Sequence, residues 1–363
     1  MALAGDRPLN IRVDKWSPDD LYDSRDVTRS EAPGREGHVR WSWHTLSHLL
    51  ICPRRFQLAV LGQMVSATAA QPLQIGIAVH TGMEVFWRRV MWEDANWRLH
   101  PPWRTMPGEL DKVVTAAAKD AAQVVAADPR IGADEHLVAL RVLSNYAYEA
   151  ARTLVAKWRP LWVEGVLAVD LKDVAHAGSG VSIPWEARPD LIVVEEGDTK
   201  NPGVWVVDHK TAARAQASEL MAYRMDGQVL GNILAARLGG FPEVRGFIVN
   251  MLGKSAAPSF YHGYVTPSEA LLREFADEVG RREGEFVGRM ATNSWPRAFH
   301  RGACVDQYGS CAYYGPCEEG VGPLGVLSGT YPGFAKIGGS ERDDQLEEAV
   351  DIVFGHLNRG GAA

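Results

Sequence analysis

The apolar residues change their spacing near residue 160, and this change limits the fold more than any other feature of the sequence. Before it, apolar side chains recur three and four residues apart, as at Ile75, Val79 and Met83, which is the period of a helix that buries one face. After it, short Val-rich runs alternate with Gly, Pro, Asn and Asp, which is typical of strands. We therefore expect an α/β protein, mostly helical over about 43–158 and with a sheet core over about 162–290.

Capping and breaking residues place the individual elements. Ser42 is a candidate N-cap, Pro53 should interrupt the first helix directly after Cys52, and Pro160 should close a later one. Further helices are expected at 75–91, 108–127, 134–158, 218–238 and 268–290, and strands at 162–171, 190–195, 204–208, 244–252 and 260–265.

The two ends of the chain differ in composition from its middle. Residues 1–40 are polar and rich in Pro, Gly and charge, so we expect a flexible N-terminal arm. Residues 41–320 should form the main domain, and 321–363 a Gly-rich tail with one amphipathic helix near 344–357. The first ten residues have no apolar segment of the kind found in signal peptides, and no apolar run approaches the roughly 20 residues that cross a bilayer. A cytoplasmic protein is therefore expected, with no membrane partner.

Charge and cysteine content exclude some classes of protein. The formal net charge is -7, which argues against a surface that is basic all over but leaves room for a local basic groove. Four cysteines in a chain without an export signal are not expected to form disulfides, because the cytosol keeps thiols reduced.

Charged side chains gather where two predicted strands meet. Asp190 opens one strand, and Asp208-His209-Lys210 closes the next. Asp208 and Lys210 are two residues apart, so both side chains point to the same face of a strand, and Asp190 can lie beside them across the hairpin. Two carboxylates and a lysine can hold a divalent cation and a water, which phosphodiester hydrolysis requires. Alone, each is more often a surface ion pair; together they favour catalysis, with His80 as a further metal ligand.

Several short motifs follow one another in a definite order. They are residues 42–56 ending in Cys-Pro-Arg-Arg-Phe, 76–80 ending in His80, Glu164, 187–190, 206–211, Gln228, and Cys304, Cys311 and Cys317. This ordered set, over about residues 41–320, resembles the PD-(D/E)XK nuclease superfamily. It is most similar to the branch that contains the RecB nuclease domain, the AddB nuclease and the CRISPR-adaptation iron–sulfur nucleases.

The resemblance implies a fold and roles for these residues. The fold would be a restriction-endonuclease-like core, a mixed central sheet flanked by helices, with a helical insertion at about 92–158. His80, Asp190 and Asp208 would bind Mg²⁺ or Mn²⁺ with the His209 backbone carbonyl, and the imidazole favours Mn²⁺. Lys210 would position or deprotonate the attacking water, and Gln228 would orient the lysine or the DNA. Asn232 stands where the family has a tyrosine, and Glu164 is open between a supporting group and an exposed strand residue.

The cysteines allow several interpretations from their spacing alone. Cys304, Cys311 and Cys317 are separated by six and five residues, and Cys52 is remote, whereas structural zinc sites favour two to four residues between paired cysteines. Zinc, a four-thiolate iron–sulfur cluster and free thiols all remain open. The resemblance implies a 4Fe-4S cluster that joins the first helix to the C-terminal loop. Nearby aromatic residues, Phe299 among them, are expected to pack against this loop, with DNA stacking as the alternative.

The function implied is metal-dependent DNA cleavage, by an exonuclease acting on single-stranded or end-opened DNA in recombination, repair or phage replication. The alternative is a non-catalytic DNA-binding or scaffold module that retains the fold and the cluster. Lys254-Ser255 lacks the earlier glycine of a Walker A loop, since position 248 is Ile, so any helicase would be a separate protein. Candidate phosphate contacts, each equally compatible with an ordinary solvated arginine, are Arg54, Arg55, Arg88 and Arg89.

Overall fold

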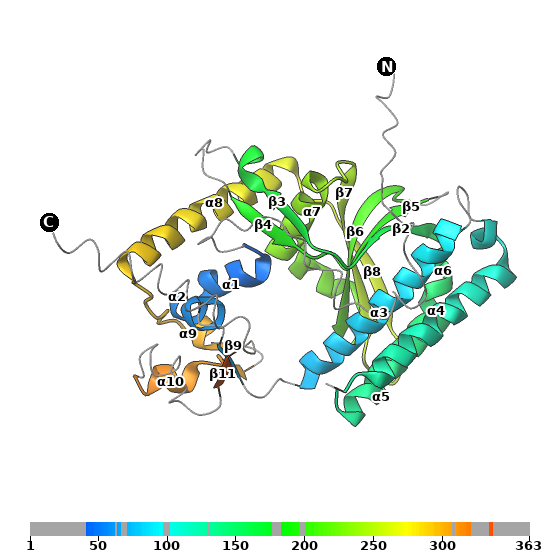
Figure 1. Ribbon diagram of the computed structural model, residues 1–363, viewed down its shortest axis with the longest axis horizontal. Coiled ribbons are helices and arrows are strands. Elements are labelled where there is room, and N and C mark those ends of the chain that lie inside the picture. Colours follow the sequence, from blue (N-terminus) through cyan, green and yellow to red (C-terminus); the bar gives the residue numbers. More distant parts are fainter. Residues whose placement is uncertain are drawn as a thin grey trace, which may run out of the picture. The chain divides into compact units, whose positions relative to one another are not determined.

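The chain divides into two compact units, whose helices and strands are labelled in Figure 1. The computed structural model describes residues 41–61, 64–66, 71–96, 102–129, 131–175, 183–196, 200–306, 309–320 and 334–336. Of these, unit 1 comprises the parts within 71–167 and 188–267, and unit 2 the remainder. The expected N-terminal arm and the amphipathic tail segment lie outside the described residues.

A five-stranded mixed sheet forms the centre of unit 1, with the strand order β2-β5-β6-β7-β8. Its strands are β2 (Trp158–Val163), β5 (Leu191–Glu195), β6 (Gly203–Ala212), β7 (Val244–Gly253) and β8 (Phe260–Val265). The β5–β6 hairpin is antiparallel, as the sequence predicts, and β6 and β7 are the one parallel pair in this sheet. This arrangement confirms the expected mixed sheet flanked by helices.

A helical layer covers one face of the sheet. It consists of α3 (Gln71–Asn96), η3 (Pro102–Thr105), α4 (Pro107–Ala127), α5 (Ala133–Tyr146), the π-helical turn η4 (Ala147–Ala151) and α6 (Arg152–Lys157). The apolar stripe of α3, including Val79, Met83 and Val90, is fully buried in one cluster with Val207 and Ile248 of the sheet. Because this stripe fixes the rotation of α3, it also fixes where His80 points.

The other face of the sheet carries the crossover between the parallel strands. After β6 the chain forms a 3-10 segment, η6 (Ala217–Tyr223), and then α7 (Gly227–Leu238), which packs on β6 and β7. The single helix expected at 218–238 is thus two elements. Asp226 separates them, because its side chain caps the N-terminus of α7 by accepting from the backbone N–H of Gln228 at 2.7 Å.

Residues 158–171 differ from the prediction in two ways. The helix ends at Lys157, and Pro160 lies inside β2, where an edge strand with a register shift tolerates a residue that lacks an N–H. The strand expected at 162–171 is also interrupted. Glu164 has a φ of 41°, a left-handed conformation that turns the chain away from the sheet.

Unit 2 gathers segments that are distant in the sequence. It contains α1 (Trp43–Ile51), α2 (Pro53–Phe56), η2 (Gln57–Leu61), β1 (Met64–Ser66), β3 (Leu167–Asp170), η5 (Leu171–Asp173), β4 (Pro184–Ala187), α8 (Glu269–Thr292), α9 (Arg301–Cys304), β9 (Val305–Asp306), β10 (Gly309–Ser310), α10 (Tyr314–Glu318) and β11 (Phe334–Lys336). Ser42 caps α1 and Pro53 begins α2, as expected. Trp41, Phe56, Phe286 and Trp295 form its aromatic core.

None of the helices in the described part of the chain is both long and apolar enough to cross a membrane.

Candidate active site

Asp190 is the point at which the residues of the site in unit 1 meet. It directly precedes β5, and the pairing of Leu191 with Val207 places it opposite Asp208. Its Oδ2 accepts the backbone N–H of His209 at 2.6 Å and lies 3.3 Å from Nδ1 of His80. The hairpin and α3 therefore hold the carboxylate from two sides.

A second set of contacts fixes Lys210 beside Asp208. The Nζ of Lys210 lies 2.7 Å from Oδ2 of Asp208 and donates to Oε1 of Gln228 at 3.0 Å. The amide of Gln228 donates in turn to Oδ1 of Asp208 at 3.0 Å. Because Gln228 lies in the first turn of α7, the Asp226 cap fixes the backbone from which it reaches the lysine.

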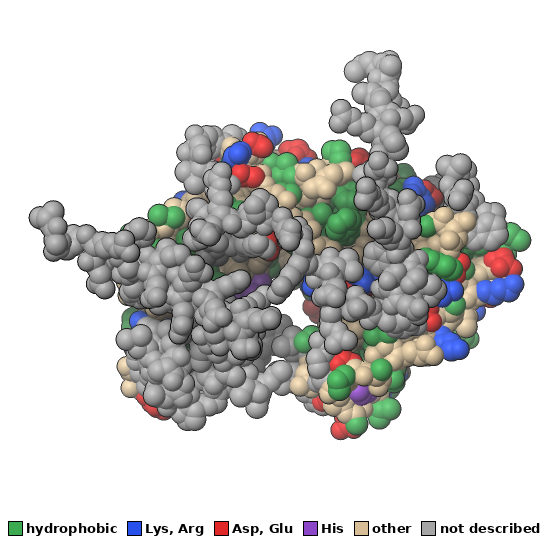
Figure 2. All heavy atoms as spheres, in the orientation of Figure 1, with side chains coloured by type: hydrophobic (Ala, Val, Ile, Leu, Met, Phe, Trp, Pro, Cys, Tyr) green, Lys and Arg blue, Asp and Glu red, His purple; other side chains and the backbone are tan. Residues whose placement is uncertain are grey.

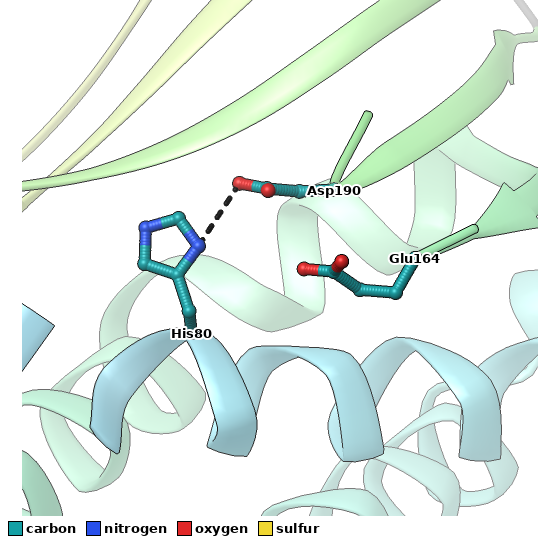
Figure 3. Close-up of side chains that lie close together, drawn as sticks. All are labelled: His80, Glu164 and Asp190. Carbon is teal, nitrogen blue, oxygen red and sulfur yellow. Dashed lines mark ion pairs between the residues drawn. The ribbon is translucent and has the colours of Figure 1, made fainter. Parts of the chain in front are cut away.

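Glu164 joins the site from the end of β2, and the sequence left its role open. Its backbone N–H donates to the carbonyl of Asp190 at 3.0 Å, and its carboxylate lies 3.0 Å from Nε of Arg188. His80, Glu164 and Asp190 each offer one ligand atom, and these atoms lie within 4.8 Å of one another. In Figure 3 the His80 ring and the Glu164 carboxylate approach the Asp190 carboxylate from two elements. The signal for Glu164 in the sequence was its place in the ordered motif set, since the strand expected at 162–171 ran through it.

Burial and mutual repulsion shift the ionisation of these groups. Burial opposes protonation of His80, but the charge of Asp190 and its hydrogen bond outweigh it and raise the His80 pKa to about 9. Burial raises the pKa of Asp208 to about 6, although Lys210 opposes the shift. Burial, followed by the charges of Asp190 and Glu84, raises the pKa of Glu164 to about 8. At neutral pH the metal-free site therefore keeps protons on His80 and Glu164, and a metal ion bound there would have to displace them.

Most of the chain matches a known protein family. A family model of the PD-(D/E)XK nuclease superfamily matches residues 40–318. The chain belongs to the PD-(D/E)XK nuclease superfamily. Membership implies a metal-dependent nuclease, a phosphodiesterase acting on DNA that usually uses Mg²⁺ or Mn²⁺.

No curated protein matches the chain significantly. A solved structure described as "Crystal structure of SSO0001" is 17% identical, covers 56% of this chain and 74% of its own, and has a TM-score of 0.25.

The arginines proposed as DNA contacts lie in different surroundings within this PD-(D/E)XK chain. Arg88 is buried against Glu84 at 2.6 Å, and Arg89 pairs with Glu93 and Asp120. The charges of both are therefore engaged inside the helical layer. Arg54 and Arg55 belong to unit 2. Figure 2 shows basic and acidic side chains interspersed over the helices of unit 1 on the face drawn.

Asn232 occupies the position where the family has a tyrosine. Its side chain is buried in α7, 6% exposed, and its Nδ2 has no hydrogen-bond partner among the described residues. The contacts of Lys210 with Asp208 and Gln228 are formed without it.

The four cysteines all lie in unit 2 as half-buried free thiols. The Sγ of Cys52 accepts the backbone N–H of Ala298 at 3.4 Å, the Sγ of Cys304 approaches the Ala298 carbonyl at 3.6 Å, and the Cys311 N–H donates to the Cys304 carbonyl at 2.8 Å. Cys52 and Cys304 thus both contact the Ala298 backbone, and Cys311 is hydrogen-bonded to Cys304.

Proposed function

We propose that this chain is an exonuclease that hydrolyses phosphodiester bonds of single-stranded or end-opened DNA. The observation that carries the proposal is the convergence of His80, Glu164 and Asp190 beside the fixed pair Asp208 and Lys210. This group combines carboxylate and imidazole metal ligands with the positively charged amine of Lys210 beside them.

The acidic residues and the histidine are the metal ligands in this proposal. Mg²⁺ or Mn²⁺, when bound, neutralises the scissile phosphate and polarises the attacking water. His80, Asp190 and Asp208 would hold the ion together with the backbone carbonyl of His209. Glu164 joins this set because its carboxylate shares the same space. Binding would displace the proton that His80 carries in the metal-free protein.

Lys210 acts as a fixed positive charge. Burial lowers its pKa, but the Asp208 charge and hydrogen bond outweigh burial and raise it above the ordinary value. The amine therefore stays protonated at neutral pH, where it positions the water and stabilises the charge that develops on the phosphate. Gln228 is a positioning residue, because it contacts both Lys210 and Asp208.

The cysteines in this proposal hold one structural 4Fe-4S cluster in a cytoplasmic protein, where thiols stay reduced. The motif order supports the RecB- and AddB-like branch, and with it a role in recombination, repair or phage replication beside a separate helicase. The contacts of Cys52 and Cys304 with the Ala298 backbone, and of Cys311 with the Cys304 carbonyl, support the shared centre.

Purified protein should be assayed on three labelled substrates, namely linear single-stranded DNA, blunt duplex DNA and circular single-stranded DNA. With Mg²⁺ or Mn²⁺, the linear substrates should be shortened from their ends while the circle stays intact, and EDTA should stop the reaction. Lys210→Ala should abolish cleavage without loss of DNA binding.

Glu196→Gln is the matched control, because Glu196 is an exposed carboxylate in unit 1 that pairs with Arg159, and it should cleave normally. Cleavage of the circle would reject the exonuclease assignment. Binding without cleavage in either metal would favour the non-catalytic module instead.

A further inference from the structure

One aromatic side chain near the cysteines does not pack as the sequence predicts. Trp295 and Tyr313 are each 5% exposed, whereas Phe299, between them in the sequence, is 88% exposed. Single exposed apolar side chains are common on protein surfaces, so the backbone and the charges around Phe299 decide what its ring could contact.

The backbone that carries Phe299 is held firmly inside unit 2. Trp295 stacks on Phe56, with ring centroids 5.7 Å apart and planes at 17°. Arg54 donates its backbone N–H to the Pro296 carbonyl at 3.2 Å and its Nε to the Trp295 carbonyl at 3.0 Å. Both backbone groups of Ala298 contact cysteine sulfurs. The exposed ring is therefore displayed from a fixed position, which lowers the entropy cost of binding.

The charge around Phe299 favours one kind of partner. Residues 294–304 contain no Asp or Glu but include Arg297, His300 and Arg301, although the whole chain has a net charge of -7. The Nε of Arg297 is buried and has no hydrogen-bond partner in the part of the chain described. An exposed aromatic ring flanked by cations matches a nucleotide, which offers a base to stack on and a phosphate beside it.

We propose that Phe299 stacks on an unpaired nucleobase of the DNA substrate while Arg297 and its basic neighbours contact the phosphates. This inference rests on the proposed function and adds to it a binding position for a single strand in unit 2. The cysteines then serve substrate binding indirectly, because they hold the backbone from which Phe299 projects.

The test is fluorescence anisotropy of the full-length protein in EDTA with two labelled 20-nucleotide probes, oligo-dT and an abasic oligomer of equal length. Wild-type protein should bind oligo-dT more tightly than the abasic probe, which has the same phosphates but no bases. Phe299→Ala should weaken binding to oligo-dT about 5- to 100-fold, the range for loss of one stacked base, and should leave abasic binding unchanged. Phe299→Trp should restore the affinity for oligo-dT.

Tyr148→Ala is the matched control, because Tyr148 is an aromatic residue 73% exposed on the helical layer of unit 1, and it should bind both probes normally. The inference would be overturned if Phe299→Ala bound oligo-dT within twofold of wild type, or if it lost affinity for both probes equally. Either result would favour a protein as the partner of the exposed ring. Cleavage is measured in parallel with Mn²⁺. Normal cleavage with unchanged binding rejects only the stacking, whereas no cleavage by wild type rejects the proposed function.

Discussion

At the scale of single residues, Glu164 combines two features that cost free energy in the metal-free protein, and only the buried carboxylate would be relieved by a cation. Its carboxylate is buried near Asp190 and Glu84, and its backbone is left-handed. Glu164→Gln should therefore make the metal-free protein more stable but weaken Mn²⁺ binding by about tenfold, or about 1.4 kcal/mol. The rise in melting temperature on adding Mn²⁺ should shrink accordingly.

Glu196→Gln again provides the comparison, since its exposed carboxylate should affect neither quantity. An unchanged Mn²⁺ response in Glu164→Gln would show that the carboxylate supports the backbone turn without binding the ion.

Glu283 of α8 is a buried carboxylate with a different consequence. It is 4% exposed and accepts from Nε1 of Trp41, and burial raises its pKa to about 6 from 4.5. The folded state holds this proton more tightly than the unfolded state, so stability should fall as the pH rises from about 4.5 to about 6. Glu283→Gln should thus raise the free energy of unfolding by up to about 2 kcal/mol at pH 7.5 and change it little at pH 4, as measured by urea denaturation.

Glu285, two residues further along α8, should respond in the opposite direction. Burial would raise its pKa, but hydrogen bonds from Arg289 and Arg282 lower it. Glu285→Gln should slightly destabilise the protein at pH 7.5. Destabilisation by both substitutions would contradict the assignment of Glu283 as an unfavourable charge.

At the scale of elements, the cap of α7 connects helix stability to the reaction. Asp226→Ala should remove the cap hydrogen bond and cost about 1 kcal/mol. It should also loosen Gln228, so that Lys210 is less well placed and kcat falls, while KM for Mn²⁺ stays constant. Steady-state kinetics with a labelled oligonucleotide would measure both.

Ser268→Ala is the control for capping alone, because Ser268 caps α8 of unit 2 by accepting from the N–H of Leu271 at 3.2 Å. It should cost a similar free energy of unfolding without lowering kcat. Equal losses of kcat in both variants would mean that general destabilisation explains the effect.

Hydrophobic spacing predicted most helices and strands, but it did not locate the breaks between them. The helices 75–91 and 268–290 and the strands of the β5–β6 hairpin follow from apolar periodicity. Pro160 misled because its effect depends on whether it lies in a helix or in an edge strand, which only sheet pairing determines. The turn at Glu164 depends on a left-handed backbone at a residue that carries no local signal for it.

At the scale of the whole molecule, the two units have separate hydrophobic cores, and the cysteines belong only to unit 2. If the cysteines hold the proposed cluster, Cys52→Ala should lose iron and increase hydrogen exchange in α1 and in residues 309–320, because the cluster would hold these segments. Amides of β5, β6 and β7 in unit 1 should keep their protection. The metal dependence of residual cleavage should be unchanged, since no proposed ligand of the catalytic ion is a cysteine.

Protein isolated without oxygen is the reference for this comparison and should contain about four irons per chain. A colourless protein with one zinc, or unchanged exchange in Cys52→Ala, would contradict the cluster. Neither result would affect the residues around Asp190.

Sequence spacing anticipated the part of the site that lies on one hairpin and missed the part that depends on the fold. Asp208 and Lys210 share a face because of the two-residue period of a strand, and Asp190 follows from the pairing. Glu164 and the cap at Asp226 could not be placed, because each depends on a chain reversal that tertiary structure fixes. The pairing of Arg88 with Glu84 was visible as a four-residue spacing on one helix, but its burial was not.

Unit 2 is built from three stretches of chain interrupted by the segments of unit 1, and this order has a consequence during synthesis. Cys52 leaves the ribosome 265 residues before Cys317. At about 5–20 residues per second, its thiol would wait roughly 13–50 s for the last ligand of the proposed cluster. The sheet of unit 1 can form in that interval, so iron insertion would be a late step of maturation. Oxidants present during translation should therefore damage Cys52 before any other cysteine of the centre.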